Sequence, residues 1–170
     1  MNIALVAHDS RKKELVEWVK YNYKTLSENF YKIYATGTTG KLVQEALIEA
    51  DGWFSDETEK KRFYEYKVTR LHSGPLGGDQ EIGAMIANGE IDVLIFFCDN
   101  LIQQGHQNDV SALTRLASLY NIAFATNRTT ADMILTSPLL KDENYERILP
   151  SAIEHYENRF NDKTTKSDEQ

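Results

Sequence analysis

The chain has 170 residues and a net charge of −7, with 41% hydrophobic and 26% charged residues. This length suits one domain with a sizeable core, and the acidic balance argues against nucleic acid as the main partner. No apolar run approaches the roughly 18–20 residues that span a membrane. The single cysteine, Cys98, excludes an internal disulfide, which fits a reducing compartment. From these features together we expect a cytoplasmic protein with no membrane partner.

Short apolar or β-branched segments alternate with amphipathic segments along the chain. Residues 3–7 form an apolar run typical of a strand buried on both faces, and a polar loop and a helix over residues 11–23 follow it. The same order then repeats. Further strands are expected over residues 30–35, 64–71, 91–98 and 122–126, and further helices over residues 41–50, 81–88, 109–120, 127–135 and 143–160, the last interrupted at Pro150.

This alternation predicts a doubly wound α/β fold, in which helices cover both faces of a mostly parallel five-stranded sheet. We expect one domain over residues 1–160 and a flexible polar tail over residues 161–170. In such sheets ligands bind outside the carboxyl ends of the strands. The polar residues that follow each predicted strand are therefore the candidate site.

Polar residues after the first three strands suit a phosphate group. Hydroxyls, glycine N–H groups and one ammonium are the donors that a phosphate monoester needs. The stretch GTTGK is not a Walker A loop, because its glycines are only three residues apart, nor is it a dinucleotide fingerprint. A Thr/Gly-rich loop without a ligand is the alternative. The candidate donors are Lys12, Thr36, Gly37, Thr38, Thr39, Ser73 and Gly74.

Three aspartates, Asp9, Asp79 and Asp99, follow the first, third and fourth predicted strands. Carboxylates gathered at one rim repel one another, so we expect at least one to have a raised pKa and to serve as a general base. The alternative is that each aspartate caps a helix. Asp79 illustrates the choice, because it lies in the glycine-rich stretch SGPLGGDQ directly before a predicted helix.

Two loop histidines, His8 and His106, are candidates to donate a hydrogen bond to a carbonyl that becomes an enolate. His72 and His155 are expected to be merely solvated. The histidines with Asp9 and Asp99 also form a conceivable metal set. Neither HxH nor HxxxH spacing occurs, however, and Lys12 opposes a cation, so we expect no metal.

These residues resemble the methylglyoxal synthase family. The matching stretches run in order over about residues 3–138 and include IALVAHD, YATGTTG, SGPLGGDQEIGA, IDVLIFFCD and NIAFATN. The resemblance implies conversion of dihydroxyacetone phosphate to methylglyoxal and inorganic phosphate without a cofactor. It also implies a homohexamer that is inhibited by phosphate, with Arg115 and Arg159 as candidates for contacts between subunits or with phosphate.

By motif, the resemblance implies that Asp79 is the general base and that His106 polarises the substrate carbonyl. His8 would help to hold the substrate, and the seven phosphate donors would hold the ester and then the leaving group. Asp9 and Asp99 match carboxylates that shape the site and its proton traffic.

The sequence also departs from the family pattern. Cys98 and Asn100 replace Trp and Pro around Asp99, Gln107-Asn108 replaces Asp-Pro after His106, and about residues 51–70 look like an insertion. Two other functions stay open. One is a ligand-sensing module without catalysis, and the other is an isomerase or aldolase-like enzyme that acts on a triose phosphate.

Overall fold

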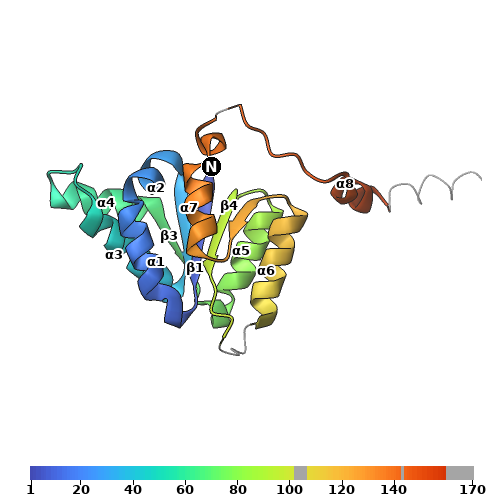
Figure 1. Ribbon diagram of the computed structural model, residues 1–170, viewed down its shortest axis with the longest axis horizontal. Coiled ribbons are helices and arrows are strands. Elements are labelled where there is room, and N and C mark those ends of the chain that lie inside the picture. The colour runs from blue at the N-terminus through green and yellow to red at the C-terminus, as the bar shows by residue number, and fades with distance from the viewer. Residues whose placement is uncertain (102–106, 143, 160–170) are drawn as a thin grey trace, which may run out of the picture.

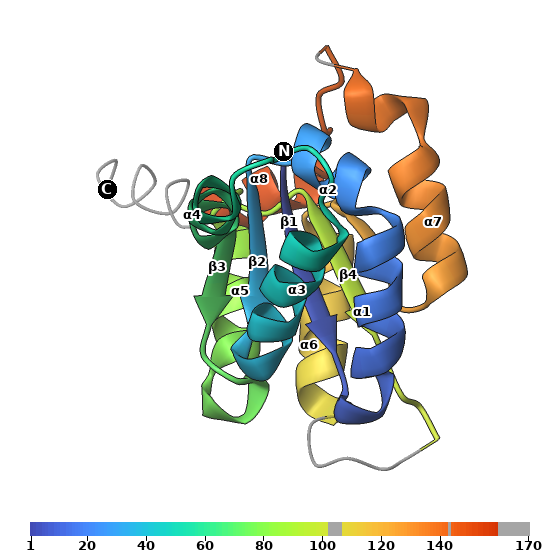
Figure 2. The ribbon, with the colours of Figure 1, turned by 90° about the vertical axis from the view of Figure 1, so that its left-hand side faces the viewer.

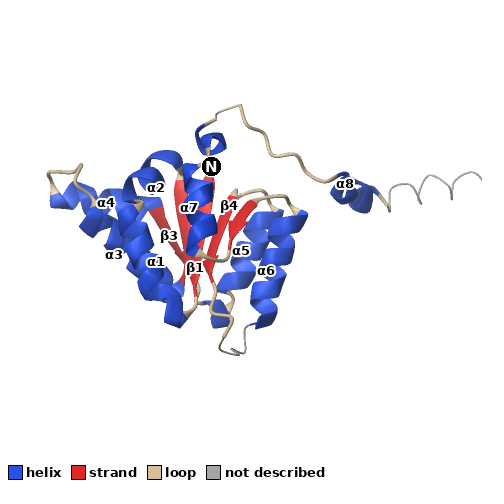
Figure 3. Cartoon of the chain, in the orientation of Figure 1, coloured by secondary structure: helices blue, strands red, loops and turns tan. Residues whose placement is uncertain are grey.

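A five-stranded sheet forms the centre of the computed structural model, which describes residues 1–101, 107–142 and 144–159. All strand pairs are parallel, and helices cover both faces (Figure 1, Figure 3). The expected doubly wound α/β fold is confirmed. In the order β3-β2-β1-β4-β5, the strands are Val68–Leu71, Lys32–Thr36, Asn2–Ala7, Val93–Phe97 and Ala123–Ala125.

The helices fall into two layers, one on each side of the sheet (Figure 2). Those on the first face are α1 (Lys12–Tyr21), α2 (Tyr23–Asn29), α3 (Gly37–Ala50), α4 (Glu57–Lys67) and α7 (Arg128–Thr136). The second face carries α5 (Gly78–Ala87) and α6 (Gln107–Leu119). The described residues also include the one-turn helices η1 (Asp9–Arg11), η2 (Gly74–Leu76) and η3 (Pro138–Lys141) and the helix α8 (Ser151–Asn158).

Strand β1 supplies core residues to both layers. Ile3 and Leu5 pack with α1, α3 and α7 on the first face, while Ala4 and Val6 pack with α5 and α6 on the second. This double burial explains why residues 3–7 carry no polar side chain. Because the chain proceeds outward from β1 to β3 and then crosses back to β4, the strand order reverses between β1 and β4. In sheets of this kind ligands bind outside the carboxyl ends of the strands near such a reversal.

The strand expected over residues 64–71 is wrong in its first half. Helix α4 continues to Lys67, and β3 begins only at Val68. Asp56 starts this helix, because its side chain accepts hydrogen bonds from the N–H groups of Thr58 and Glu59. Tyr64 then lies fully buried against the first face of the core, which holds the aromatic segment in a helix.

Several expected boundaries also move. The helix expected over residues 41–50 begins earlier, at Gly37, so the Thr/Gly-rich stretch over residues 36–40 is largely the first turn of α3. Helix α6 begins at Gln107, two residues before its expected start, and Asn127 caps α7, because its side chain accepts from the N–H of Thr130. Residues 144–150 are not helical, so within the described residues the helix expected over 143–160 is reduced to α8.

Within the described residues, none of the helices has the length and apolar character needed to cross a bilayer.

Candidate active site

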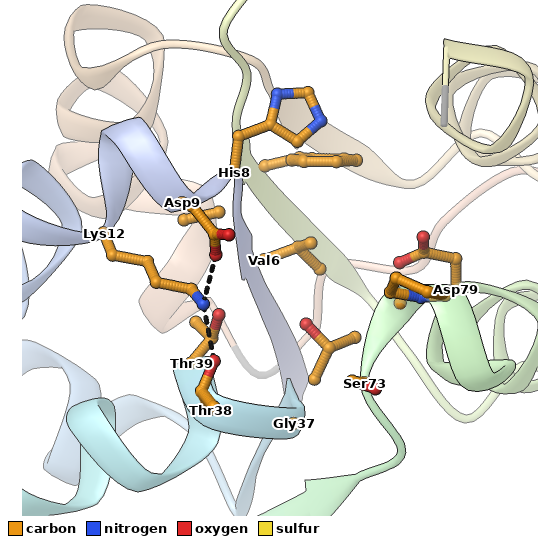
Figure 4. A pocket seen from close by; sticks show the side chains of 14 residues that line it. Val6, His8, Asp9, Lys12, Gly37, Thr38, Thr39, Ser73 and Asp79 are labelled. Atoms are coloured by element: carbon orange, nitrogen blue, oxygen red, sulfur yellow. Dashed lines mark hydrogen bonds and ion pairs between the residues drawn. The ribbon is translucent and has the colours of Figure 1, made fainter. Parts of the chain in front are cut away.

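A cavity of about 340 Å³ opens at the carboxyl ends of β1, β2 and β3 (Figure 4). Its wall combines the polar residues that follow these strands with a few apolar side chains from β1, β4 and η2. The sequence predicted ten of the lining residues: His8, Asp9, Lys12, Thr36, Gly37, Thr38, Thr39, Ser73, Gly74 and Asp79. The other four are Val6, Ala7, Pro75 and Phe96.

One wall of the cavity carries the ammonium of Lys12, at the start of α1. Its Nζ lies 2.6 Å from Oδ1 of Asp9 and donates a hydrogen bond to Oγ1 of Thr38. The hydrogen bond and the charge of Lys12 hold the pKa of Asp9 below its usual value. Asp9 is therefore ionised at neutral pH, and the raised pKa expected for one of the three aspartates does not occur here.

The amino end of α3 lies beside this ammonium. An α-helix leaves the N–H groups of its first turn without partners inside the helix, and they carry partial positive charge. Gly37 donates its N–H to the carbonyl of His72, which ties the end of β2 to the end of β3. The wall thus combines an ammonium, threonine hydroxyls and a helix amino end, and this combination suits a phosphate dianion.

Asp79 stands on the opposite wall (Figure 4). It is the second residue of α5 and is only 7% exposed, and the residue that caps this helix is Gly77, in a left-handed conformation. A Cβ added to Gly74 would lie 2.9 Å from Oδ2 of Asp79, so glycine is needed there for the carboxylate to approach this closely. The buried carboxylate therefore faces the phosphate wall across the cavity.

His8 lies on the rim, and a backbone contact fixes its proton. The N–H of Asp99 donates to Nδ1 of His8 over 2.8 Å, so Nδ1 is the acceptor and the neutral ring carries its proton on Nε2. Within the described residues Nε2 is buried without a hydrogen-bond partner. The Nε2–H of His8 is thus a donor that the contacts of the described residues leave unused.

The predicted catalytic residues are only partly brought together. Asp99 is not among the lining residues but lies behind His8, where its side chain accepts from Ser10 over 2.5 Å and from the N–H of Leu101 over 3.0 Å. His106 lies outside the described residues. Among the residues that are described, no group of three or more His, Cys, Asp and Glu side chains is arranged to hold a metal ion.

Two residues that contribute to the site were missed from the sequence. Ser10 supports Asp99, and Phe96 packs edge-on against the His8 ring at 5.1 Å between ring centroids. The alternation of β4 carried a signal for Phe96, because it places Phe96 and Phe97 on opposite faces. Ser10 gave no comparable signal, since its role depends on the course of the loop after β1.

The family model of the MGS-like domain matches residues 14–126. A methylglyoxal synthase from Maridesulfovibrio salexigens is 51% identical over 143 residues, which cover 84% of this chain and 87% of that protein. The chain belongs to the methylglyoxal synthase family. Family membership makes it an enzyme, a lyase.

Other members of the methylglyoxal synthase family give the same result. A methylglyoxal synthase from Leptospira interrogans is 48% identical over 149 residues, covering 88% of this chain and 87% of that protein. A crystal structure of methylglyoxal synthase from Elizabethkingia anophelis has a TM-score of 0.71 and 42% identity, covering 88% of this chain and 85% of that chain.

Proposed function

We propose that the protein is a methylglyoxal synthase that converts dihydroxyacetone phosphate to methylglyoxal and inorganic phosphate without a cofactor. One observation carries this proposal: a phosphate-type wall around Lys12 and a buried carboxylate, Asp79, face each other across one cavity of about 340 Å³. A triose phosphate has a phosphate at one end and an acidic C–H bond near the other, so it suits such a divided cavity.

The phosphate group binds between the starts of α1 and α3 on one side and Ser73 and η2, beside Asp79, on the other. Lys12 supplies the ammonium. When the phosphate binds, it replaces the Thr38 hydroxyl, and partly the Asp9 carboxylate, as the partner of this ammonium. Hydroxyls and N–H groups complete the binding of the ester and later of the leaving group. The donors assigned here are those of Lys12, Thr36, Thr38, Thr39, Ser73 and Gly74, and Gly37, whose N–H is bonded to the His72 carbonyl, shapes the start of α3 beside them.

Asp79 removes a proton from the carbon that bears the hydroxyl, and the carbonyl oxygen takes the electron pair as an enediolate. His8, through its Nε2–H, and His106 donate hydrogen bonds to the developing oxyanion. The enediolate then expels phosphate by cleavage of the C–O bond, and the remaining enol takes up a proton on carbon to give methylglyoxal. Before the phosphate binds, Asp9 keeps the Lys12 ammonium at the cavity, and the N–H of Asp99 holds the His8 ring in place.

The geometry of the phosphate wall decides between elimination and isomerisation. Reprotonation of the enediolate at the neighbouring carbon yields the aldose isomer, which is the reaction of an isomerase. Elimination of phosphate is favoured instead when the C–O(P) bond lies perpendicular to the enediolate plane. Donors fixed on two helices and a turn impose one orientation on the phosphate. This is why we propose a lyase rather than an isomerase.

One assay tests the proposal against its rivals. Purified protein is given dihydroxyacetone phosphate, and methylglyoxal, free phosphate and the aldose isomer are followed together. Equal amounts of methylglyoxal and phosphate support the proposal. The aldose isomer without free phosphate indicates an isomerase, and binding without turnover indicates a ligand-sensing module.

We further propose a cytoplasmic homohexamer with allosteric inhibition by phosphate, in which Arg115 and Arg159 contact neighbouring subunits or phosphate. The family resemblance supports this assembly. Exposed apolar side chains in the C-terminal part of the chain, such as Met133, Ile148 and Leu149, also support it. In Figure 1, α8 lies apart from the body of the protomer. We also propose a single domain over residues 1–160 with an insertion at about 51–70 and a flexible tail over 161–170.

A further inference from the structure

His72 joins three segments of the cavity wall, although its ring is largely exposed to solvent. Its carbonyl accepts from the N–H of Gly37 over 3.0 Å, which links it to the start of α3. Its own N–H donates to Oε2 of Glu81 over 3.0 Å, and its Nδ1 lies 2.6 Å from Oε1 of the same carboxylate. The Glu81 carboxylate thus contacts both the backbone N–H and the ring of His72.

Glu81 lies in the first turn of α5, two residues after Asp79. The carboxylate therefore connects the helix that carries the base with the residue directly before Ser73 and Gly74, two phosphate donors. The hydrogen bonds from the His72 ring and N–H lower the pKa of Glu81, so it remains an ionised acceptor at neutral pH. The sequence-based expectation of a merely solvated His72 missed this contact.

The same two segments also touch through their backbones. Gly78 donates its N–H to the carbonyl of Ser73 over 3.0 Å. A Cβ added to Gly78 would lie 2.0 Å from the carbonyl oxygen of His72, so the start of α5 rests directly on the His72–Ser73 backbone. A small shift at this junction therefore changes the placement of Asp79 relative to the phosphate donors.

We propose that Glu81 is a positioning residue. By accepting a hydrogen bond from the His72 N–H, its carboxylate fixes the position of the base, Asp79, relative to the phosphate-binding backbone that follows His72. This inference rests on the proposed function. Proton abstraction needs the base and the reacting carbon in a defined geometry, and a misplacement of about 1 Å can cost up to a hundredfold in rate. Glu81 acts in this way without touching the substrate.

The contact with the backbone carries the effect, rather than the contact with the ring. An ion pair this exposed, with 69% of the His72 side chain and 37% of the Glu81 side chain accessible, contributes little by itself. A glutamine at position 81 can still accept from the His72 N–H with its amide oxygen and donate to Nδ1 with its NH₂ group. The backbone bond also survives when the His72 ring is removed.

The test compares Glu81→Ala, Glu81→Gln and His72→Ala with the wild type, using dihydroxyacetone phosphate turnover. Glu49→Ala is the matched control, because it breaks another exposed carboxylate pair, that of Glu49 with Lys20. We expect Glu81→Ala to lower kcat about tenfold and to change KM less than about threefold. Glu81→Gln, His72→Ala and Glu49→Ala stay within about twofold of the wild type.

Hydrogen exchange of the His72 amide gives a second readout that needs no turnover. It accelerates in Glu81→Ala and not in Glu81→Gln. The inference is overturned if Glu81→Ala matches the wild type, if glutamine fails to rescue, or if activity falls only in proportion to the folded fraction. A wild type without turnover refutes the proposed function instead, and unchanged amide exchange in Glu81→Ala then still overturns the inference.

Discussion

The two ends of the sheet each hold a lysine that is partly or wholly withdrawn from water, but with different partners. At the carboxyl end, Nζ of Lys12 contacts two side chains, those of Asp9 and Thr38. At the amino end, directly before β3, Lys67 is 7% exposed, and its Nζ donates to the backbone carbonyls of Ser27 and Phe30. Burial, and less strongly the charge of Lys32, lower the pKa of Lys67.

The kind of partner separates a binding ammonium from a structural one. Side chains such as Asp9 and Thr38 can rotate away, so an arriving phosphate can replace them at Lys12. The carbonyls around Lys67 belong to the last turn of α2 and to Phe30, which caps that helix, and they cannot leave without unfolding it. We therefore expect substitutions at the carboxyl end to change function and those at the amino end to change stability.

The largest expected effect is at the carboxyl end, on the wall opposite Lys12. Asp79→Asn removes the general base and should lower kcat by about 10²–10⁴-fold. Binding of inorganic phosphate, measured by calorimetry, should stay within about threefold of the wild type because the phosphate wall is untouched. Loss of phosphate binding together with turnover would show instead that Asp79 only supports the start of α5.

The next effect concerns Lys12 itself. Lys12→Met removes a charge-assisted contact to the phosphate and should weaken phosphate binding about 10–100-fold. The free energy of unfolding should change by less than about 0.5 kcal/mol, because the lost partners are partly exposed side chains. Lys13→Met, at an exposed position in the same helix, is the control. A marked loss of stability in Lys12→Met would contradict the distinction between a binding lysine at the carboxyl end and a structural lysine at the amino end.

Lys67→Met makes the reverse test at the amino end. It leaves two buried carbonyl groups without their donor and should lower the free energy of unfolding by about 1–3 kcal/mol, measured by urea denaturation. Both kcat and KM should stay within about twofold of the wild type. The control is Lys61→Met, at an exposed position in α4. Lower activity in the fully folded variant would contradict a purely structural role.

The sequence predicted the carboxyl end better than the amino end, and the reason is physical. Apolar runs such as residues 3–7 and 91–98 fix the strands, and parallel strands bring their following residues to one rim. Lys12, Ser73 and Asp79 were found in this way. The structure at the amino end depends instead on tertiary contacts. Tyr64 and Lys67 look like strand residues locally, yet burial beside Ser27 keeps them helical.

Contacts through the backbone were also beyond prediction at the carboxyl end. Asp99 was identified by its carboxylate, but its N–H is the group that fixes the proton of His8. The His72 N–H likewise binds Glu81. Because every residue carries the same N–H group, the sequence does not say which of these groups will meet a side chain.

The smallest expected effect is a change in stability at the amino end of the sheet. Tyr64 is buried there, and its hydroxyl lies 3.1 Å from Oγ of Ser27. Tyr64→Phe loses this hydrogen bond and should lower the free energy of unfolding by about 0.5–1.5 kcal/mol near neutral pH, with unchanged turnover.

The pH dependence of the same variant gives an independent check. Burial raises the pKa of Tyr64 above the ordinary value of 10.0, so the folded state keeps this proton where the unfolded state has lost it. The stabilisation from this group is fully present below pH 10 and is lost as the pH rises above that value. The wild type should therefore lose stability more steeply than Tyr64→Phe above pH 10. Lys67, whose pKa is lowered, changes stability in the opposite direction, as the pH rises toward 10.5, but it is present in both proteins and cancels in the comparison. Parallel curves would mean that the Tyr64 hydroxyl is open to water, and the amino end would then be less tightly closed than the Lys67 contacts indicate.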